Sequence, residues 1–269
     1  WTFAFLFKRG IRDRVRDYGE FFGRTKAGTP TMGGLLILGA VLTASILFCT
    51  VSISSAERAE RLAFPLLFLT CLWFGGLGAL DDYLKVRGGS SDAGLSRSAN
   101  LGMQIPFALY FAVVLYSDRL SPFDPDIRTR IFLPFPANTG LDLGWLYIPF
   151  VVLVMTSISN AINFADGLDG LAVVPAALTA AVFGLFAYLM NHKFAASFFS
   201  FEYVPGMLEV TVFASALVGA CIGFLWFNSY PAQIFMGDTG SQLLGGVIAA
   251  LAILSKQELL FLIAGGVFV

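Results

Sequence analysis

The segment 62-LAFPLLFLTCLWFGGLGAL-80 contains no charged residue and is followed at once by 81-DDYLK-85. An uncharged apolar run of this kind is long enough to cross the hydrocarbon core of a bilayer, about 30 Å thick, as a single helix. Carboxylates at the edge of a membrane are costly and are usually kept for a function. The stretch therefore predicts a membrane span with polar chemistry at one end.

The same pattern recurs along the chain of 269 residues, of which 57% are hydrophobic and 13% charged. This composition excludes an ordinary soluble domain, and alternating β-barrel patterns are absent. We predict an all-α, polytopic transmembrane bundle of about eight spans, each near the length a bilayer requires. The expected helices lie near 31–53, 63–80, 101–117, 144–164, 168–190, 208–227 and 232–254, with an incomplete one from 257.

The remaining composition argues against other classes of site. Cys49, Cys71 and Cys221 all fall inside apolar blocks, so we interpret them as small hydrophobic residues. His192 has no neighbouring metal-binding residue and is interpreted as a loop residue. The formal net charge is −1 and the basic residues are spread over several loops, so no nucleic-acid partner is expected.

The distribution of basic residues predicts the orientation. Ten lysines and arginines fall before the first full span and in the loop that begins at Lys85, against seven on the other side. The positive-inside rule then places the N-terminal segment in the cytoplasm. Following the spans from there, four polar motifs emerge on this one face: 26–34, 81–85, 160–170 and 235–240.

The first of these motifs after a full span is "GALDDYLKV". On a helix, Asp81 and Lys85 are four residues apart and share a face. Asp81 and Asp82 repel one another unless a cation or a proton lies between them. The alternative is a solvated helix end with a salt bridge.

The next motif, 159-SNAINFADGLDGLA-172, places two amides before two carboxylates. Asn160 and Asn163 lie on one face of the last turn of a span, and Asp166 and Asp169 follow in a glycine-rich loop. Either Asp could cap the next helix, but capping does not account for all four polar residues.

The last motif, 231-PAQIFMGDTGS-241, contains Asp238, ten residues after Asn228. Asp238 could cap the helix that follows it. Five aspartates on one face, at positions 81, 82, 166, 169 and 238, nevertheless need positive charge beyond Lys26 and Lys85. Mg²⁺ suits carboxylates together with phosphate oxygens, so the pattern predicts metal-assisted phosphate chemistry at a membrane surface.

Two other functions fit parts of this pattern. A cation or proton transporter would also hold intramembrane carboxylates, but it would place them near the bilayer midplane and often shows inverted repeats. A CDP-alcohol phosphotransferase shares part of "DGLDG", but the further acidic residues of that family are missing after Gly170.

Four motifs in order, "GTPTMGG", "DDYLK", "NAINFADGLDGLA" and "FNSYPAQIFMGDTGS", resemble the polyprenyl-phosphate hexose-1-phosphate transferase superfamily. Within it, "PTMGG" and the last motif are similar to the phospho-N-acetylmuramoyl-pentapeptide transferase family. The resemblance implies transfer of the sugar phosphate from UDP-N-acetylmuramoyl-pentapeptide to undecaprenyl phosphate, which gives lipid I and UMP. It also implies a homodimer in the bacterial inner membrane, with the site facing the cytoplasm.

The resemblance further implies roles for individual residues. Asp238 is the expected Mg²⁺ ligand, with Asp81 and Asp82 as catalytic residues and further candidate ligands at the same centre. Asp81 is the candidate for handling the lipid phosphate. Direct attack and a two-step route through an aspartyl-phosphate both remain open.

The expected substrate-binding residues surround this centre. Phe235 would stack on the uracil, and Asp169 with the Gly167–Leu168 backbone would contact the edge of the base. The polar floor would comprise Lys26, Thr31, Lys85, Asn160, Asn163, Asp166 and Asn228.

Residues 1–269 are expected to form one transmembrane transferase domain. The family's first span and its C-terminal spans, with a histidine-rich loop, have no counterpart in this sequence, so we expect a fragment of a longer protein. A UDP-N-acetylhexosamine donor is the nearest alternative, and a transporter or an inactive scaffold is the alternative from a different class.

Overall fold

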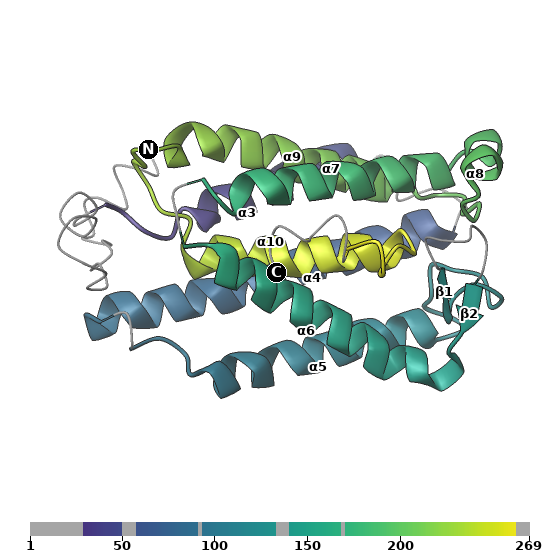
Figure 1. Ribbon diagram of the computed structural model, residues 1–269, viewed down its shortest axis with the longest axis horizontal. Coiled ribbons are helices and arrows are strands. Elements are labelled where there is room, and N and C mark those ends of the chain that lie inside the picture. Colours follow the sequence, from purple (N-terminus) through teal and green to yellow (C-terminus); the bar gives the residue numbers. More distant parts are fainter. Residues whose placement is uncertain (1–28, 50–57, 91–92, 133–139, 168–169, 262–269) are drawn as a thin grey trace.

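The computed structural model describes residues 29–49, 58–90, 93–132, 140–167 and 170–261. This part of the chain is mainly helical, which confirms the all-α prediction (Figure 1). Its helices are α3 (Gly34–Cys49), α4 (Arg58–Gly88), α5 (Arg97–Tyr116), α6 (Tyr147–Ala165), α7 (Val173–Met190), α8 (Lys193–Phe199), α9 (Leu208–Asn228) and α10 (Gly237–Leu254).

Six of these helices are long and apolar enough to cross a membrane: α4, α5, α6, α7, α9 and α10. Helix α3 is apolar but shorter, and the span expected from residue 257 lies largely outside the described residues. A helix satisfies all its backbone groups internally, which lipid requires of any spanning segment. The chain is therefore a multi-pass membrane protein.

Helix α10 is the centre of the bundle. Its spanning window is 89% buried, against 56% or less for the other spans, although its mean hydropathy of 1.3 is the lowest of the six. It packs mainly between α4 and α6, with α3 and α7 beside it. Since protein rather than lipid surrounds it, α10 can carry the small and polar residues that its sequence holds.

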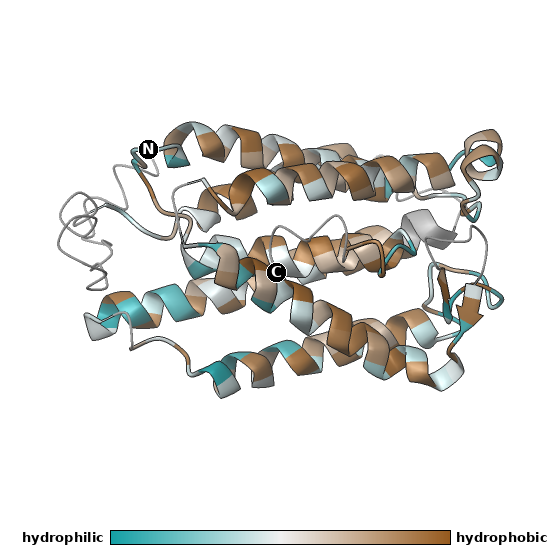
Figure 2. Cartoon of the chain, in the orientation of Figure 1, coloured by the Kyte–Doolittle hydropathy of each residue, from teal (hydrophilic) through white to brown (hydrophobic). Residues whose placement is uncertain are grey.

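The alternation of the spans brings four helix ends together. The C-terminal ends of α4 and α6 and the N-terminal ends of α7 and α10 lie at one end of the bundle, on the left in Figure 1. Figure 2 shows hydrophilic residues gathered there, along the last turns of α4 and the first turns of α5. All the polar motifs that fall in the described residues are at this end.

Several predicted boundaries are wrong by about five residues or more, including the starts of α4 (58 instead of 63) and α7 (173 instead of 168), and two of the differences are informative. Helix α4 was expected to end near residue 80 but continues to Gly88, so the aspartate pair and Lys85 belong to the helix itself. Helix α10 was expected from residue 232 but begins at Gly237, because the backbone before it pairs with another segment. Both differences bear on the polar end.

The opposite end of the bundle carries two elements that the sequence did not indicate. Strands β1 (Arg130–Phe132) and β2 (Gly140–Asp142) form an antiparallel hairpin in which Ile131 pairs with Leu141. Helix α8 is a short helix between α7 and α9. Elements of three to seven residues carry too little periodicity to be recognised from sequence.

A buried lysine joins the hairpin to the bundle. Just beyond α10, Lys256 Nζ donates to the carbonyl of Arg128 at 2.7 Å and to the hydroxyl of Tyr147 at 3.0 Å. The Tyr147 hydroxyl in turn donates to Glu258 Oε1 at 2.9 Å. Burial lowers the pKa of Lys256 to about 8, and the nearby charge of Glu258 partly opposes this shift.

We therefore predict that Lys256→Met destabilises the bundle. The substitution leaves buried oxygens without their donor, and breaking a buried charged network typically costs about 3 kcal/mol. The free energy of unfolding, measured in detergent or bicelles, should fall accordingly. Lys193→Met, which removes an exposed lysine at the same end, is the matched control; equal losses for the two variants would contradict the assignment.

Candidate active site

The glycine-rich segment before α3 pairs with the segment before α10. Gly33 N donates to Phe235 O at 2.9 Å, Gly34 N to Met236 O at 2.8 Å, and Phe235 N to Pro30 O at 2.8 Å. These bonds explain why 231–236 is not helical. They place the "PTMGG" and "FMGDTG" motifs side by side.

Two glycines allow the helices to approach closely at this point. A Cβ at Gly34 would overlap the backbone of Gly240, and a Cβ at Gly78 would overlap the carbonyl of Asp238. Glycine is the residue that permits such backbone contact. The first turn of α10 therefore lies directly against α3 and α4.

Asp82 of α4 caps α10 from the side. Its Oδ1 accepts from Asp238 N at 3.0 Å, and its Oδ2 accepts from Thr239 N at 2.9 Å and from Thr239 Oγ1 at 2.6 Å. The first N–H groups of a helix have no partner within it, and a carboxylate is their preferred acceptor. Asp82 is 4% exposed, and its oxygens are committed to this role.

Lys85 links two other carboxylates. Its Nζ lies 2.7 Å from Asp81 Oδ2, the expected pairing one helical turn away, and it also pairs with Asp238 Oδ2. Asp81 Oδ1 accepts from the Leu95 backbone N–H. One ammonium thus offsets two converging carboxylates on neighbouring helices.

These contacts exclude three alternative interpretations that the sequence left open. Asp238 does not cap α10, since that role belongs to Asp82 and Asp238 lies within the first turn. Asp81 and Asp82 are buried and not a solvated helix end. Asp166 does not cap α7, whose N-cap is Ala172 without a side-chain bond.

The amides of α6 anchor this helix to its neighbours. Asn163 Nδ2 donates to Ser241 Oγ of α10 at 3.0 Å, and Asn160 Nδ2 donates to Gln104 Oε1 of α5 at 2.8 Å. Sequence reasoning missed Ser241, Gln104 and Leu95. The adjacency of Ser241 to "GDTG" was the one available signal, because the other two lie in stretches without a motif.

Asn228 fixes the segment that leads into α10. It is buried at the end of α9, its Nδ2 donates to Ile234 O at 2.9 Å, and its Oδ1 accepts from Gly170 N at 3.0 Å. The same segment holds Phe235, which is half-buried, beside buried Thr31. Asn228 therefore ties the loop after α6 to the loop before α10.

Asp166 ends α6 at the edge of this cluster, partly buried, and Gly167 after it is exposed. Burial, and secondly the charge of Asp82, raise the pKa of Asp166 to about 7. Asp166 is thus a fourth aspartate at the same centre. Lys26, Leu168 and Asp169 lie outside the described residues.

The donor set allows a limited metal site. Within the described residues, no group of three or more His, Cys, Asp or Glu side chains is arranged to hold a metal ion. Mg²⁺ commonly takes only one or two protein carboxylates and completes its shell with water and phosphate oxygens. Asp81 and Asp238, which converge on one cation already, fit that smaller requirement, whereas Asp82 already accepts three hydrogen bonds from the first turn of α10.

Comparison with known proteins is consistent with this arrangement. Residues 64–256 match the family described as glycosyl transferase family 4, and residues 26–38 match a phospho-N-acetylmuramoyl-pentapeptide-transferase signature. Three relatives carry the name phospho-N-acetylmuramoyl-pentapeptide-transferase. That of Nitratidesulfovibrio vulgaris (strain DP4) is 47% identical, covering 91% of this chain and 64% of the relative.

The other two are similar over a comparable range. The transferase of Desulfotalea psychrophila is 43% identical, covering 95% of this chain and 67% of the relative. That of Solidesulfovibrio magneticus is 45% identical, covering 100% of this chain and 70% of the relative. The chain thus spans about two thirds of the length of these relatives.

We predict that Asp82→Asn destabilises the bundle more than Asp81→Asn does. An asparagine offers one acceptor oxygen where Asp82 satisfies three donors, and loss of such a cap costs about 1–2 kcal/mol. Thermal unfolding of the two purified variants, each compared with wild type, measures the difference. An equal loss in both would show that Asp82 is not the specific support of α10.

A second prediction concerns pH. A folded-state pKa of about 7 for Asp166, against an ordinary 3.8, means that the folded protein holds an extra proton between these values. Its contribution to stability therefore falls as pH rises from about 4 to 7. The stability of Asp166→Asn, relative to wild type, should rise across this window in metal-free buffer. Exposed Asp126→Asn is the control, and parallel curves for wild type and both variants would contradict the prediction.

Proposed function

Because this chain belongs to glycosyl transferase family 4 and, within it, to the phospho-N-acetylmuramoyl-pentapeptide transferase family, we propose that it makes lipid I. The reaction transfers phospho-N-acetylmuramoyl-pentapeptide from its UDP donor to undecaprenyl phosphate and releases UMP. This reaction belongs to peptidoglycan synthesis. The single observation that supports it best is the Asp81–Lys85–Asp238 cluster, which lies where the ends of several membrane spans meet.

The location of the cluster suits two substrates of opposite solubility. The acceptor is a lipid phosphate whose long prenyl tail can lie only in the bilayer, and the donor is a nucleotide dissolved in water. Their phosphates can meet only at the membrane edge. We propose that this edge faces the cytoplasm of the bacterial inner membrane, as the distribution of basic residues indicates.

The chain's own residues would act by positioning and by charge. Phosphoryl transfer has little covalent chemistry to assist, so catalysis rests on alignment and on neutralising the phosphate oxygens. Lys85 would pair with the diphosphate when substrate enters, since its ammonium already lies at the centre of the cluster. Asp81, released from Lys85, would orient the attacking lipid phosphate.

We propose Mg²⁺ as the cofactor, held through Asp238 with Asp81 beside it. When bound, the ion would neutralise charge on the donor diphosphate. Asp82 would support this indirectly, by holding the first turn of α10 and so the position of Asp238.

The nucleotide would lie over the segment that Asn228 fixes. Phe235 lies in this segment and is half-buried, and its ring would stack on the uracil. Asn160, Asn163 and Asp166 would line the floor, and Asn160 remains exposed at the end of α6. We also propose, from the resemblance, that two copies of the protein form a homodimer.

The decisive experiment measures Mg²⁺-dependent UMP release by the detergent-solubilised protein, with the flanking sequence of the natural gene product included. Undecaprenyl phosphate is the acceptor, and UDP-N-acetylmuramoyl-pentapeptide and UDP-N-acetylglucosamine are offered separately. We expect release with the first donor alone. Release with the second alone would assign the enzyme to another glycan pathway, and no release with either would favour a transporter or an inactive scaffold.

Asp238→Asn tests the role of the central carboxylate. We expect turnover to fall about 100-fold or more, the usual loss when a group that stabilises transferring charge is removed. Mn²⁺ binding, followed by electron paramagnetic resonance, should weaken in parallel, while Asp126→Asn leaves both quantities unchanged. Near-normal turnover and Mn²⁺ affinity in Asp238→Asn would refute the metal assignment.

A further inference from the structure

Helix α8 lies at the end of the bundle opposite the aspartate cluster (Figure 1). It exposes three aromatic side chains. Phe194 is 86% exposed, Phe198 73% and Phe199 54%. The rings of Phe194 and Phe198 stack at a centroid distance of 6.5 Å, and Phe198 meets Phe199 edge-on at 5.0 Å. The three rings form one continuous apolar surface, which we call the α8 aromatic patch.

The patch is held in a fixed position. The segment that follows α8 is bound to the C-terminal end of α7, which precedes α8: Val204 N donates to Met190 O at 3.0 Å, and Gly206 N donates to Asn191 Oδ1 at 2.9 Å. On its inner side, α8 buries Ala196. The outward direction of the phenylalanines is therefore a property of the fold and not of a loose loop.

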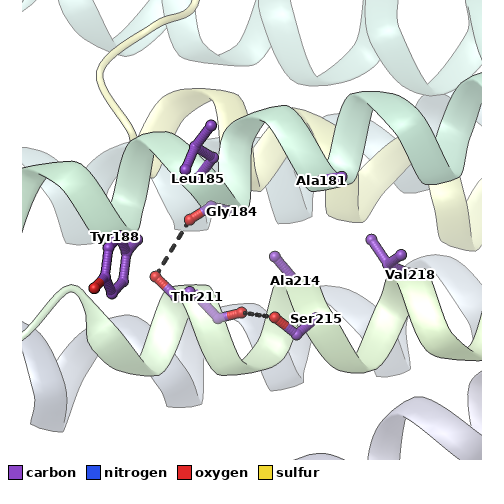
Figure 3. A pocket seen from close by; sticks show the side chains of 8 residues that line it. All are labelled: Ala181, Gly184, Leu185, Tyr188, Thr211, Ala214, Ser215 and Val218. Atoms are coloured by element: carbon purple, nitrogen blue, oxygen red, sulfur yellow. Dashed lines mark hydrogen bonds between the residues drawn. The ribbon is translucent and has the colours of Figure 1, made fainter.

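The neighbouring surface is already suited to lipid. Helices α7 and α9, which flank α8 in the chain, are both membrane spans, and α7 exposes Leu178 and Leu185. A shallow, mainly apolar groove of about 320 Å³ lies between α7 and α9, and it extends from Tyr188 to Val218 (Figure 3). Two of its hydroxyls bond within the protein, since Thr211 Oγ1 donates to Gly184 O and Ser215 Oγ donates to Thr211 O.

The connection between this surface and α8 is direct. Tyr188 lines the groove, and its ring meets the ring of His192, immediately before α8, at a centroid distance of 4.6 Å. Lys193, the first residue of α8, holds its ammonium 5.2 Å from the Tyr203 ring. Apolar rings and a lysine at the end of two spans match the level of a bilayer where acyl chains give way to phosphates.

We propose that α8 is an interfacial anchor, whose aromatic patch inserts into the lipid leaflet at the end of the bundle remote from the aspartate cluster. Phe194, Phe198 and Phe199 would lie among the upper acyl chains, and Lys193 would lie near the lipid phosphates. An apolar patch on a rigid support, continuous with lipid-facing spans, is the arrangement that such anchoring requires. The inference rests on the membrane fold alone and does not depend on the proposed reaction.

The test is a depth measurement by electron paramagnetic resonance in lipid nanodiscs. A spin label is attached to Phe198→Cys, and separately to Phe194→Cys, in a chain whose native cysteines are replaced by alanine. Leu185→Cys on α7 is the lipid-facing reference, and Asp126→Cys, exposed in the loop before β1, is the aqueous reference. Oxygen concentrates in lipid, and a nickel chelate concentrates in water.

We expect the ratio of oxygen to nickel collision rates at positions 194 and 198 to exceed that at 126 several-fold and to approach that at 185. A ratio equal to that at 126 would place α8 in water and overturn the proposal. Low accessibility to both reagents, with an immobilised label, would show that a second copy or another protein covers the patch, and would overturn it equally. The two labelled positions guard against a local disturbance at either one.

Discussion

The carboxylate of Asp82 bound to the first turn of α10 is the interaction on which the polar end of this molecule depends. A buried helix terminus exposes N–H groups that water cannot reach, so a partner must come from the protein. Asp82 supplies it from the body of α4, and Gly78 lets the two helices come close enough for the contact. The positions of Asp238 and, through Lys85, of Asp81 follow from this one junction. The two adjacent aspartates thus have different roles: Asp82 binds the backbone of α10, and Asp81 pairs with the ammonium of Lys85.

Much of the architecture could be predicted from the sequence, because lipid imposes strict rules on what may cross it. Long uncharged runs gave the spans, and their alternation gave the common location of Asp81, Asn163 and Asp238. The roles within that location could not be predicted. Whether an aspartate caps a helix or binds a cation depends on contacts across 150 residues of chain, such as Asp82 with Thr239. Periodicity and spacing carry no information about such contacts.

The helix boundaries show the same limit in another form. Apolar content predicted the end of α4 at the first charge, whereas the helix continues through Asp81, Asp82 and Lys85 because each has a partner in the bundle. Conversely, 232–236 has the composition of a span but is not helical, since the backbones of Phe235 and Met236 bond to the segment before α3. In both places, tertiary hydrogen bonds override the local signal.

The enclosure of α10 also constrains how the protein is made. A segment with glycine at 237, 240, 245 and 246, and with Ser241 and Gln242, is poorly suited to contact with acyl chains, and its 89% enclosure keeps it away from them. It follows α4 and α6 in the chain, so the ribosome has produced its two main packing partners before it produces α10. Biogenesis can thus pass α10 from the insertion machinery directly to protein partners. The order of helices along the sequence therefore matches an order of assembly, in which the least lipid-compatible span is the last of the six to be added.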